Sequence, residues 1–325
     1  RNKSAFEIEI RGMLGESDVE DKEASILGRS VRWPPHGIEY EADTKHRQKL
    51  LAYFGFDKNT RVLGSNGDRV DHEDDAWMSQ KLEGKAATEY RGLAARLNYM
   101  SLDCPDLQFP IKQCSREMSS PTNGSLLRLK KVVRYLVDRE KIVWTYSWQD
   151  APSHGILFTD SDWGGDRIDR KSSSGGVWLL GNHVIKTWSV TQGAVALSTA
   201  EAEFYAAVEG VTRAKGLSSL CREMGYGDLS DMCKCNVDSS AAKSFINRRG
   251  LGKMRHIEIR DLWLQREARE GKLLVSKVPG GENPADLMTK IFTKKEICER
   301  LGRMNIVAVL SDVGVSSVQS VEKHS

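Results

Sequence analysis

The period of hydrophobic and polar positions changes near Trp144, and this change divides the chain into two predicted parts. Before it, apolar residues recur at helical spacing; Leu126, Leu129, Val133 and Leu136 are three, four and three positions apart. After it, short apolar runs alternate with turns rich in Gly, Asp and Ser, which is typical of antiparallel strands. The pattern predicts a mostly helical part followed by a part built on a sheet.

The helical part is predicted to begin with a hairpin. Residues 26–33 alternate, and a Pro-Pro-His-Gly turn separates them from a second strand at 38–41. A short helix follows and ends at Gly55. Residues 57–85 show no period, which indicates an exposed connection.

Three further helices are predicted, over 88–102, 106–118 and 124–137. The third carries a stripe of apolar residues on one side and a basic stripe on another. The basic stripe consists of Arg128, Lys131 and Arg134.

The pattern of the second part predicts an α/β fold with the element order βββαβααβα. Its strands would form a five-stranded mixed sheet flanked by helices. A long helix is predicted to begin at Ser198 or Thr199, where either hydroxyl can cap it, and to end at Gly225. In chain order the elements are strands 154–160, 175–181 and 184–189, the long helix, strand 232–238, helices 239–247 and 256–269, strand 273–278 and a last helix from about 283.

The length of 325 residues suits two ordinary domains. The predicted division is 1–85, 86–147, 148–300 and 301–325, the last being a poorly ordered tail. The first residue is Arg rather than Met and no signal peptide opens the chain, so we expect a piece of a longer protein.

Composition narrows the function classes. With 39% hydrophobic and 29% charged residues, the chain has no apolar run near the roughly 18 residues that a membrane span needs. Its six cysteines have no zinc spacing, which favours reduced thiols in an intracellular compartment. A net charge of +3 is weak evidence for a polyanionic partner, and most basic runs, such as 128–141 and 248–260, are solvated helix faces.

Four acids lie where predicted strands and helices end or begin: Asp160, Glu203, Asp238 and Asp286. Strands one and four can be neighbours, which would put Asp160 beside Asp238 at the ligand-binding edge of the sheet. Carboxylates that hold two Mg²⁺ ions can promote cleavage of a phosphodiester. Each acid alone is weak evidence, because acids are also common in turns and first helical turns.

Five blocks of sequence, in order, resemble the ribonuclease H domain of copia-type (Pseudoviridae) LTR-retrotransposon Pol polyproteins. The blocks are 159–176, 196–207, 237–242, 255–260 and 284–290. The resemblance implies a ribonuclease H-like fold, two Mg²⁺ ions (which Mn²⁺ can replace) and hydrolysis of the RNA strand of an RNA/DNA hybrid. It places the catalytic, metal-binding D-E-D-D set on Asp160, Glu203, Asp238 and Asp286.

Two of these acids have rivals two positions away. Glu203 is preferred to Glu201 because the residues after Glu203 resemble the sequence that follows the metal-binding glutamate of ribonucleases H. Asp162 and Asp160 share the same strand parity, so only the resemblance favours Asp160. Cellular ribonucleases H carry a histidine shortly before the fourth acid, but this chain has none there. Glu282 in that stretch is a candidate for assisting product release or metal exchange, although a solvated loop glutamate is favoured.

Candidate contacts to nucleic acid follow from the same resemblance. Arg255, His256 and Arg260 lie in one block and are candidates for phosphate binding, although His256 is equally compatible with a helix start. Trp163 and the turn after it fit either contact with a hybrid or ordinary hairpin chemistry.

The first half of the chain resembles the end of a copia-type reverse transcriptase, through blocks within 26–56 and 90–136. This implies a tail of the palm followed by a helical thumb or connection region, whose basic stripe would hold a duplex backbone. The Y-x-D-D hairpin of polymerases is absent and the acids at 72–75 are no substitute, so no polymerase activity is expected.

The leading hypothesis is therefore a Mg²⁺-dependent ribonuclease H that acts on RNA/DNA hybrids beside the upstream polymerase part of its polyprotein. A catalytically silent module that binds nucleic acid or protein is the alternative. An integrase-like strand transferase is disfavoured because its triad ends in glutamate. The resemblance fits a cytoplasmic virus-like particle and the nucleus equally.

Overall fold

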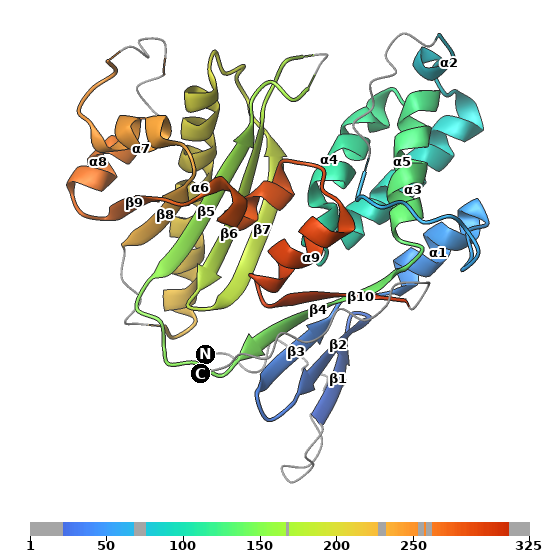
Figure 1. The fold of residues 1–325 in the computed structure, drawn as a ribbon, viewed down its shortest axis with the longest axis horizontal. Helices are drawn as coiled ribbons and strands as arrows, with labels where there is room; N and C mark the ends of the chain where they lie inside the picture. The colour runs from blue at the N-terminus through green and yellow to red at the C-terminus, as the bar shows by residue number, and fades with distance from the viewer. Residues whose placement is uncertain are drawn as a thin grey trace, which may run out of the picture.

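The computed structural model describes residues 22–67, 76–166, 169–226, 232–252, 257 and 262–311. Its strands form two five-stranded sheets (Figure 1). The first sheet has the order β1-β2-β3-β4-β10 and is antiparallel throughout. Its strands are β1 (Lys22–Ile26), β2 (Arg29–Trp33), β3 (Gly37–Glu41), β4 (Arg139–Ser147) and β10 (Ile306–Leu310).

The predicted hairpin is a three-stranded meander. Residues 26–33 were expected to form one strand, but Leu27 and Gly28 both have positive φ, 53° and 81°. Two successive residues with positive φ make the tight turn that joins antiparallel strands, so Ile26 pairs with Arg29. The alternation of residue types alone did not reveal this turn.

The helices of the first part confirm the predicted ones. Gly55 ends α1 in the left-handed conformation, and Thr122 with Ser125 forms a capping box at the start of α5. The predicted helix 106–118 consists of an α-helix between two 3₁₀ turns. The elements are α1 (Lys45–Phe54), α2 (Ala76–Ser79), α3 (Gly84–Met100), η2 (Pro105–Leu107), α4 (Gln108–Arg116), η3 (Glu117–Ser119) and α5 (Asn123–Tyr135).

The second sheet has the order β7-β6-β5-β8-β9. β5, β6 and β7 are antiparallel, and β8 and β9 add parallel strands beside β5. This arrangement confirms the predicted ribonuclease H-like fold. The elements are β5 (Gly155–Asp162), β6 (Ser173–Leu180), β7 (His183–Thr191), α6 (Thr199–Glu223), β8 (Cys233–Val237), α7 (Ser240–Asn247), α8 (Trp263–Arg269) and β9 (Leu273–Lys277).

The last predicted helix is interrupted. A 3₁₀ turn, η5 (Gly280–Glu282), precedes a second one, η6 (Pro284–Met288), and the α-helix α9 (Lys294–Gly302) starts only after Thr293 caps it. The segment of η6 lies flat against β6, because a Cβ on Gly175 would come within 2.7 Å of the Met288 Cβ.

Both faces of the second sheet are buried. One face packs against α6, α7 and α8 through side chains such as Leu157, Trp178 and Phe204. The other face contributes Val177 and Leu179 to a core that it shares with α3, α4, α5 and α9. Figure 1 shows the second sheet between these two sets of helices. Of the helices in the described ranges, none has the length and apolarity that a bilayer crossing needs.

The prediction of a poorly ordered tail from residue 301 is wrong for the first part of that segment. Residues 306–310 form β10, which pairs with β4, and Ile306 is buried. Residues 312–325 lie outside the described part of the chain. The domain boundaries at residues 85, 147 and 300 stay a prediction.

A buried ion pair fixes β4 to the helices. The Arg139 Nε lies 3.1 Å from Asp106 Oδ2, and the Tyr135 hydroxyl donates to the same carboxylate oxygen at 2.9 Å. Arg139 and Asp106 are 2% and 0% exposed. A charge at such depth is tolerated only while its partner is present.

Replacing Arg139 by methionine is therefore expected to lower the free energy of unfolding by about 3–5 kcal/mol, because Asp106 is left charged and unpaired in the core. Urea denaturation followed by circular dichroism measures this loss. Lys272→Met, which removes one partner of an exposed ion pair with Glu270, serves as the control and should change little. Equal effects of the two substitutions would contradict the importance of the buried pair.

Candidate metal centre

The register of the second sheet puts two aspartates side by side. In the parallel pair of β5 and β8, Phe158 lies opposite Asn236. Two residues further along the chain are Asp160, still within β5, and Asp238, just after β8, both beyond the last position at which the two strands pair. The expectation that strands one and four are neighbours is confirmed.

Asp160 was predicted to end its strand, but β5 continues to Asp162. The ladder with β6 extends over these positions and pairs Asp160 with Gly175. β5 therefore extends beyond the end of its parallel neighbour β8 but remains hydrogen-bonded to β6. Asp160 is therefore held in the sheet by its pairing with β6, while on the side of β8 it has no paired strand residue.

Asp286 reaches the same place from η6. The Asn283 side chain caps η6 by accepting from the Ala285 backbone N–H at 3.1 Å, and its amide donates to the Thr159 carbonyl at 2.9 Å. These two bonds tie η6 to β5. Asp160, Asp238 and Asp286 each offer a carboxylate oxygen, and the three oxygens lie within 4.8 Å of one another.

Glu203 approaches from the opposite face of β5. Gly210 lets α6 come close to the strand, since a Cβ there would lie 2.5 Å from the Thr159 Cγ2. Glu203 lies seven residues earlier, two turns away on the same side of the helix. Its Oε1 accepts from the Ser161 backbone N–H at 3.2 Å and from the Ser161 hydroxyl at 2.8 Å.

The second oxygen of Glu203 has no partner in the described part of the chain, although it is buried. Buried polar atoms are usually hydrogen-bonded, and this oxygen is one of several in the described part of the chain that are not. The three aspartate carboxylates offer the hard oxygen ligands that suit a divalent cation, whereas Glu203 lies outside the group whose oxygens are within 4.8 Å of one another. The residues present are therefore compatible with Mg²⁺ or Mn²⁺.

Burial and mutual repulsion raise the pKa values of Glu203, Asp160 and Asp238. Burial, then the charges of Asp160 and Asp238, raise the pKa of Glu203 to about 8. Burial also raises the pKa of Asp160 to about 7, with Lys290 opposing the shift. Burial likewise raises the pKa of Asp238. A divalent cation would relieve the repulsion that the four acids share.

The rival acids lie elsewhere. Asp162 accepts from the Ser173 backbone N–H, and Lys112 opposes the rise in its pKa, which burial brings to about 6. Glu201 accepts from the Leu197 backbone N–H at 2.9 Å. It lies two residues from Glu203, so it points to a different side of α6. Geometry therefore favours Asp160 and Glu203 for the centre; their roles as ligands stay a prediction.

Two contacts of the centre were missed from the sequence. The Thr289 hydroxyl donates to Asp160 Oδ2, and Lys290 pairs with both Asp160 and Asp286. Both residues belong to the block 284–290, and Lys290 is four positions after Asp286. This spacing is the usual one for an ion pair on a helix and could have been noticed.

Comparisons with known proteins agree with this picture. No protein-family model matches the chain. The Retrovirus-related Pol polyprotein from transposon TNT 1-94 of Nicotiana tabacum is 30% identical over 223 residues, which are 68% of this chain and 17% of that protein. The polyprotein from transposon RE1 of Arabidopsis thaliana is 28% identical over 218 residues, or 64% and 14%. The chain is similar to copia-type transposon Pol polyproteins.

The chain spans only 14–17% of the length of these Pol relatives. Among solved structures, the N-terminal RNase H domain of a Mycobacterium tuberculosis protein, fused to maltose-binding protein, is 15% identical. It covers 42% of this chain and 91% of its own, with a TM-score of 0.28.

The residues predicted to bind nucleic acid are only partly available in this Pol-like chain. Arg128 is ion-paired with Glu117, and the Arg134 guanidinium lies 5.9 Å from the centre of the Phe56 ring. Burial lowers the pKa of Lys131. Arg255, His256 and Arg260 lie outside the described residues. The basic stripe of α5 is thus partly used within the fold, and its binding role stays a prediction.

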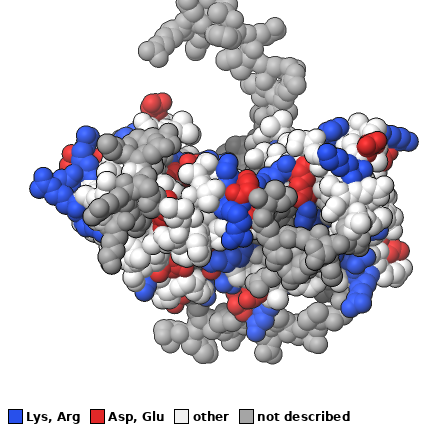
Figure 2. Space-filling view, turned by 90° about the horizontal axis from the view of Figure 1, so that it is seen from above, with Lys and Arg blue, Asp and Glu red and all other residues white. Residues whose placement is uncertain are grey.

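Nearer the centre, the Trp163 ring is half-exposed and its Nε1 donates to the Ala196 carbonyl at 2.9 Å. Glu282 lies exposed in η5. Figure 2 shows the face seen from above, where basic side chains gather at the middle and at both ends, with acidic and neutral side chains beside and between them. The described part of this face thus carries separate basic clusters.

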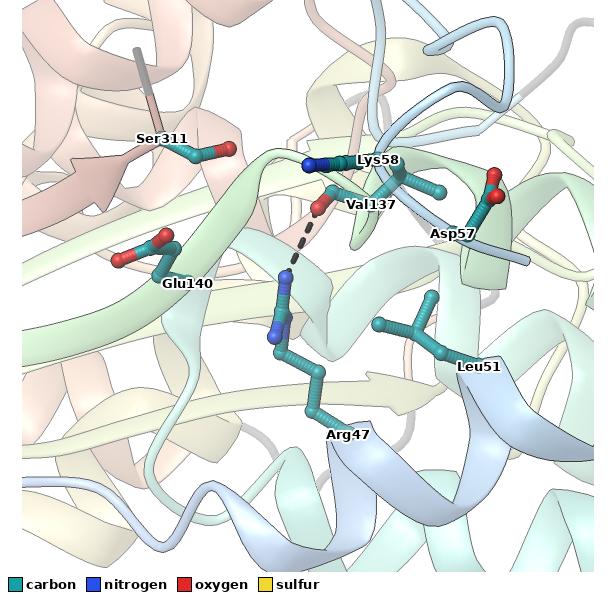
Figure 3. Close-up of a pocket in the computed structure, with 7 residues that line it drawn as sticks. All are labelled: Arg47, Leu51, Asp57, Lys58, Val137, Glu140 and Ser311. Atoms are coloured by element: carbon teal, nitrogen blue, oxygen red, sulfur yellow. Dashed lines mark hydrogen bonds between the residues drawn. The ribbon is translucent and has the colours of Figure 1, made fainter. Parts of the chain in front are cut away.

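A hollow beside the first sheet is unrelated to the acids (Figure 3). The Arg47 side chain donates to the carbonyls of Leu136 and Val137 at the end of α5, so its guanidinium serves the fold. Figure 3 shows Asp57 and Glu140 on opposite sides of the hollow. The lining residues are Arg47, Leu51, Asp57, Lys58, Val137, Glu140 and Ser311.

Glu203→Gln tests the electrostatics of the centre. Because the pKa of Glu203 in the folded protein lies above that of an unfolded chain, ionising it costs stability as pH rises from about 4.5 to about 8. At pH 8 without metal, the substitution is expected to raise the free energy of unfolding on the order of 1–3 kcal/mol. Thermal unfolding with and without Mn²⁺ measures both this gain and the expected loss of stabilisation by metal.

Glu201→Gln is the matched control, because it removes the same charge from the same helix at a residue that points elsewhere. It should leave stabilisation by Mn²⁺ intact. If the two substitutions behaved alike, Glu203 would have no special place in the centre.

Proposed function

We propose that this chain is a Mg²⁺-dependent ribonuclease H that hydrolyses the RNA strand of RNA/DNA hybrids. The observation that carries the proposal is the convergence of Asp160, Asp238 and Asp286, with Glu203 behind them, at the carboxyl ends of β5 and β8. Similarity to Retrovirus-related Pol polyproteins from transposons supports it.

The four acids would hold the two ions, which would activate the attacking water and stabilise the leaving 3′ oxygen. The chain's own part is to supply fixed, buried carboxylates. Asp160 and Glu203 are 1% and 3% exposed, so their charges act in a medium that screens them weakly. No histidine precedes Asp286 between residues 257 and 285, so no imidazole is available there to move a proton.

Recognition of the hybrid would depend on shape rather than on base sequence. RNA differs from DNA by its 2′-hydroxyls and by the wide minor groove of its helices. The upstream polymerase part of the same polyprotein is the expected partner that delivers the hybrid. The chain has no Y-x-D-D motif, and we propose no polymerase activity for it. A cytoplasmic particle and the nucleus stay equally open as its location.

One observation favours a silent binding module instead. Lys290 pairs with Asp160 and Asp286, so the acids already have a positive partner within the chain. A centre that was balanced in this way and never loaded with metal would have no nuclease activity.

A cleavage assay separates the two functions. The protein is incubated with Mg²⁺ and a hybrid of labelled RNA with DNA, beside variants Asp238→Asn and Asp150→Asn. Asp238→Asn should lower the rate about a hundredfold or more, the usual effect of removing a group that stabilises charge in the reaction. Asp150 is exposed and outside the centre, so its variant should cleave normally. Absence of cleavage by the unmodified protein would favour the silent module.

A further inference from the structure

The Lys290 ammonium lies among the acids of the candidate centre. Its Nζ is 2.6 Å from Asp286 Oδ1 and 3.2 and 3.3 Å from the two oxygens of Asp160. Asp160 and Asp286 are almost fully buried, whereas the Lys290 side chain is 40% exposed. The ammonium thus reaches inward from the protein surface to two buried carboxylates.

Lys290 is anchored at its backbone rather than along its side chain. Its N–H donates to the Asp286 carbonyl at 3.0 Å, which fixes the start of the side chain one turn after that acid. The four-carbon stem beyond this point has several rotatable bonds. Because the stem is partly exposed, the ammonium can turn out to solvent without any movement of η6.

An ammonium and a divalent cation compete for these oxygens. Mg²⁺ binds oxygens at 2.0–2.1 Å and needs the lone pairs to which the lysine now donates. The two cations would also repel each other strongly at such a distance in a buried site. Binding of one cation therefore disfavours binding of the other.

We propose that Lys290 is a built-in counter-ion of the metal centre, which occupies it in the metal-free protein and is displaced when a divalent cation binds. This inference rests on the proposed function, since it takes the acids to be metal ligands. Lys290 holds the repelling carboxylates in place before loading. Lys290 also lowers the apparent affinity for the ion, because only the fraction of molecules in which the lysine has left the acids can bind it.

Lys290→Met tests this exchange, because methionine keeps the length of the stem and removes the charge. In isothermal titration with Mn²⁺, the variant should bind about tenfold more tightly than the unmodified protein, within the usual range of coupling between competing ligands. Without metal it should unfold at a lower temperature, and saturating Mn²⁺ should close that difference.

Lys294→Met is the matched control. Lys294 is ion-paired with Asp138 rather than with the acids of the centre, so its loss should lower the unfolding temperature equally with and without Mn²⁺ and leave Mn²⁺ affinity unchanged. Lys290→Gln should repeat the tighter binding if the methionine variant fails to fold.

A measurement on the unmodified protein needs no substitution. An amine-reactive reagent followed by mass spectrometry should label Lys290 slowly without metal and several-fold faster with Mn²⁺. Equal or weaker Mn²⁺ binding by the variants, or labelling that Mn²⁺ does not change, would overturn the role of Lys290 while the metal centre stands. If no protein bound Mn²⁺ at all, the proposed function itself would fall, and this inference with it.

Discussion

The parallel pairing of β5 with β8 is the constraint on which the candidate centre depends. Its register alone sets Asp160 opposite Asp238, and the other two acids are brought to that point by close backbone contacts. Gly210 admits α6 to one face of β5, and Gly175 admits η6 to β6 on the other. A side chain at either glycine would displace one of the acids. The site therefore requires glycine at these two positions as well as the acids themselves.

Like charges brought together in this way oppose folding, and the rest of the structure has to offset that cost. Apolar cores on both faces of the second sheet stabilise it independently of the acids. Lys290 and the hydroxyl of Thr289 supply local compensation at Asp160. The centre is thus a region where the fold tolerates a loss of stability, as is common at functional sites.

Local signals predicted much of the fold: Gly55 and Ser198 bound their helices as expected. β4 and β10 were missed because each is recognisable mainly by its partner, which lies far away in the sequence. The sequence indicated the four acids but could not separate Asp160 from Asp162 by parity. Their different neighbours, Asp238 for one and Ser173 for the other, exist only after the strands have paired.

The pairing of β4 with β10 has a topological consequence. The chain leaves the first sheet through β4, builds the whole second sheet, and returns to the neighbouring position as β10. The nuclease-like fold is therefore an insertion whose two ends are fastened at adjacent strands, which prevents free rotation about a single linker. A fragment cut at residue 300 would lose one of these two attachments and would expose Ile306 and the β4 edge to solvent.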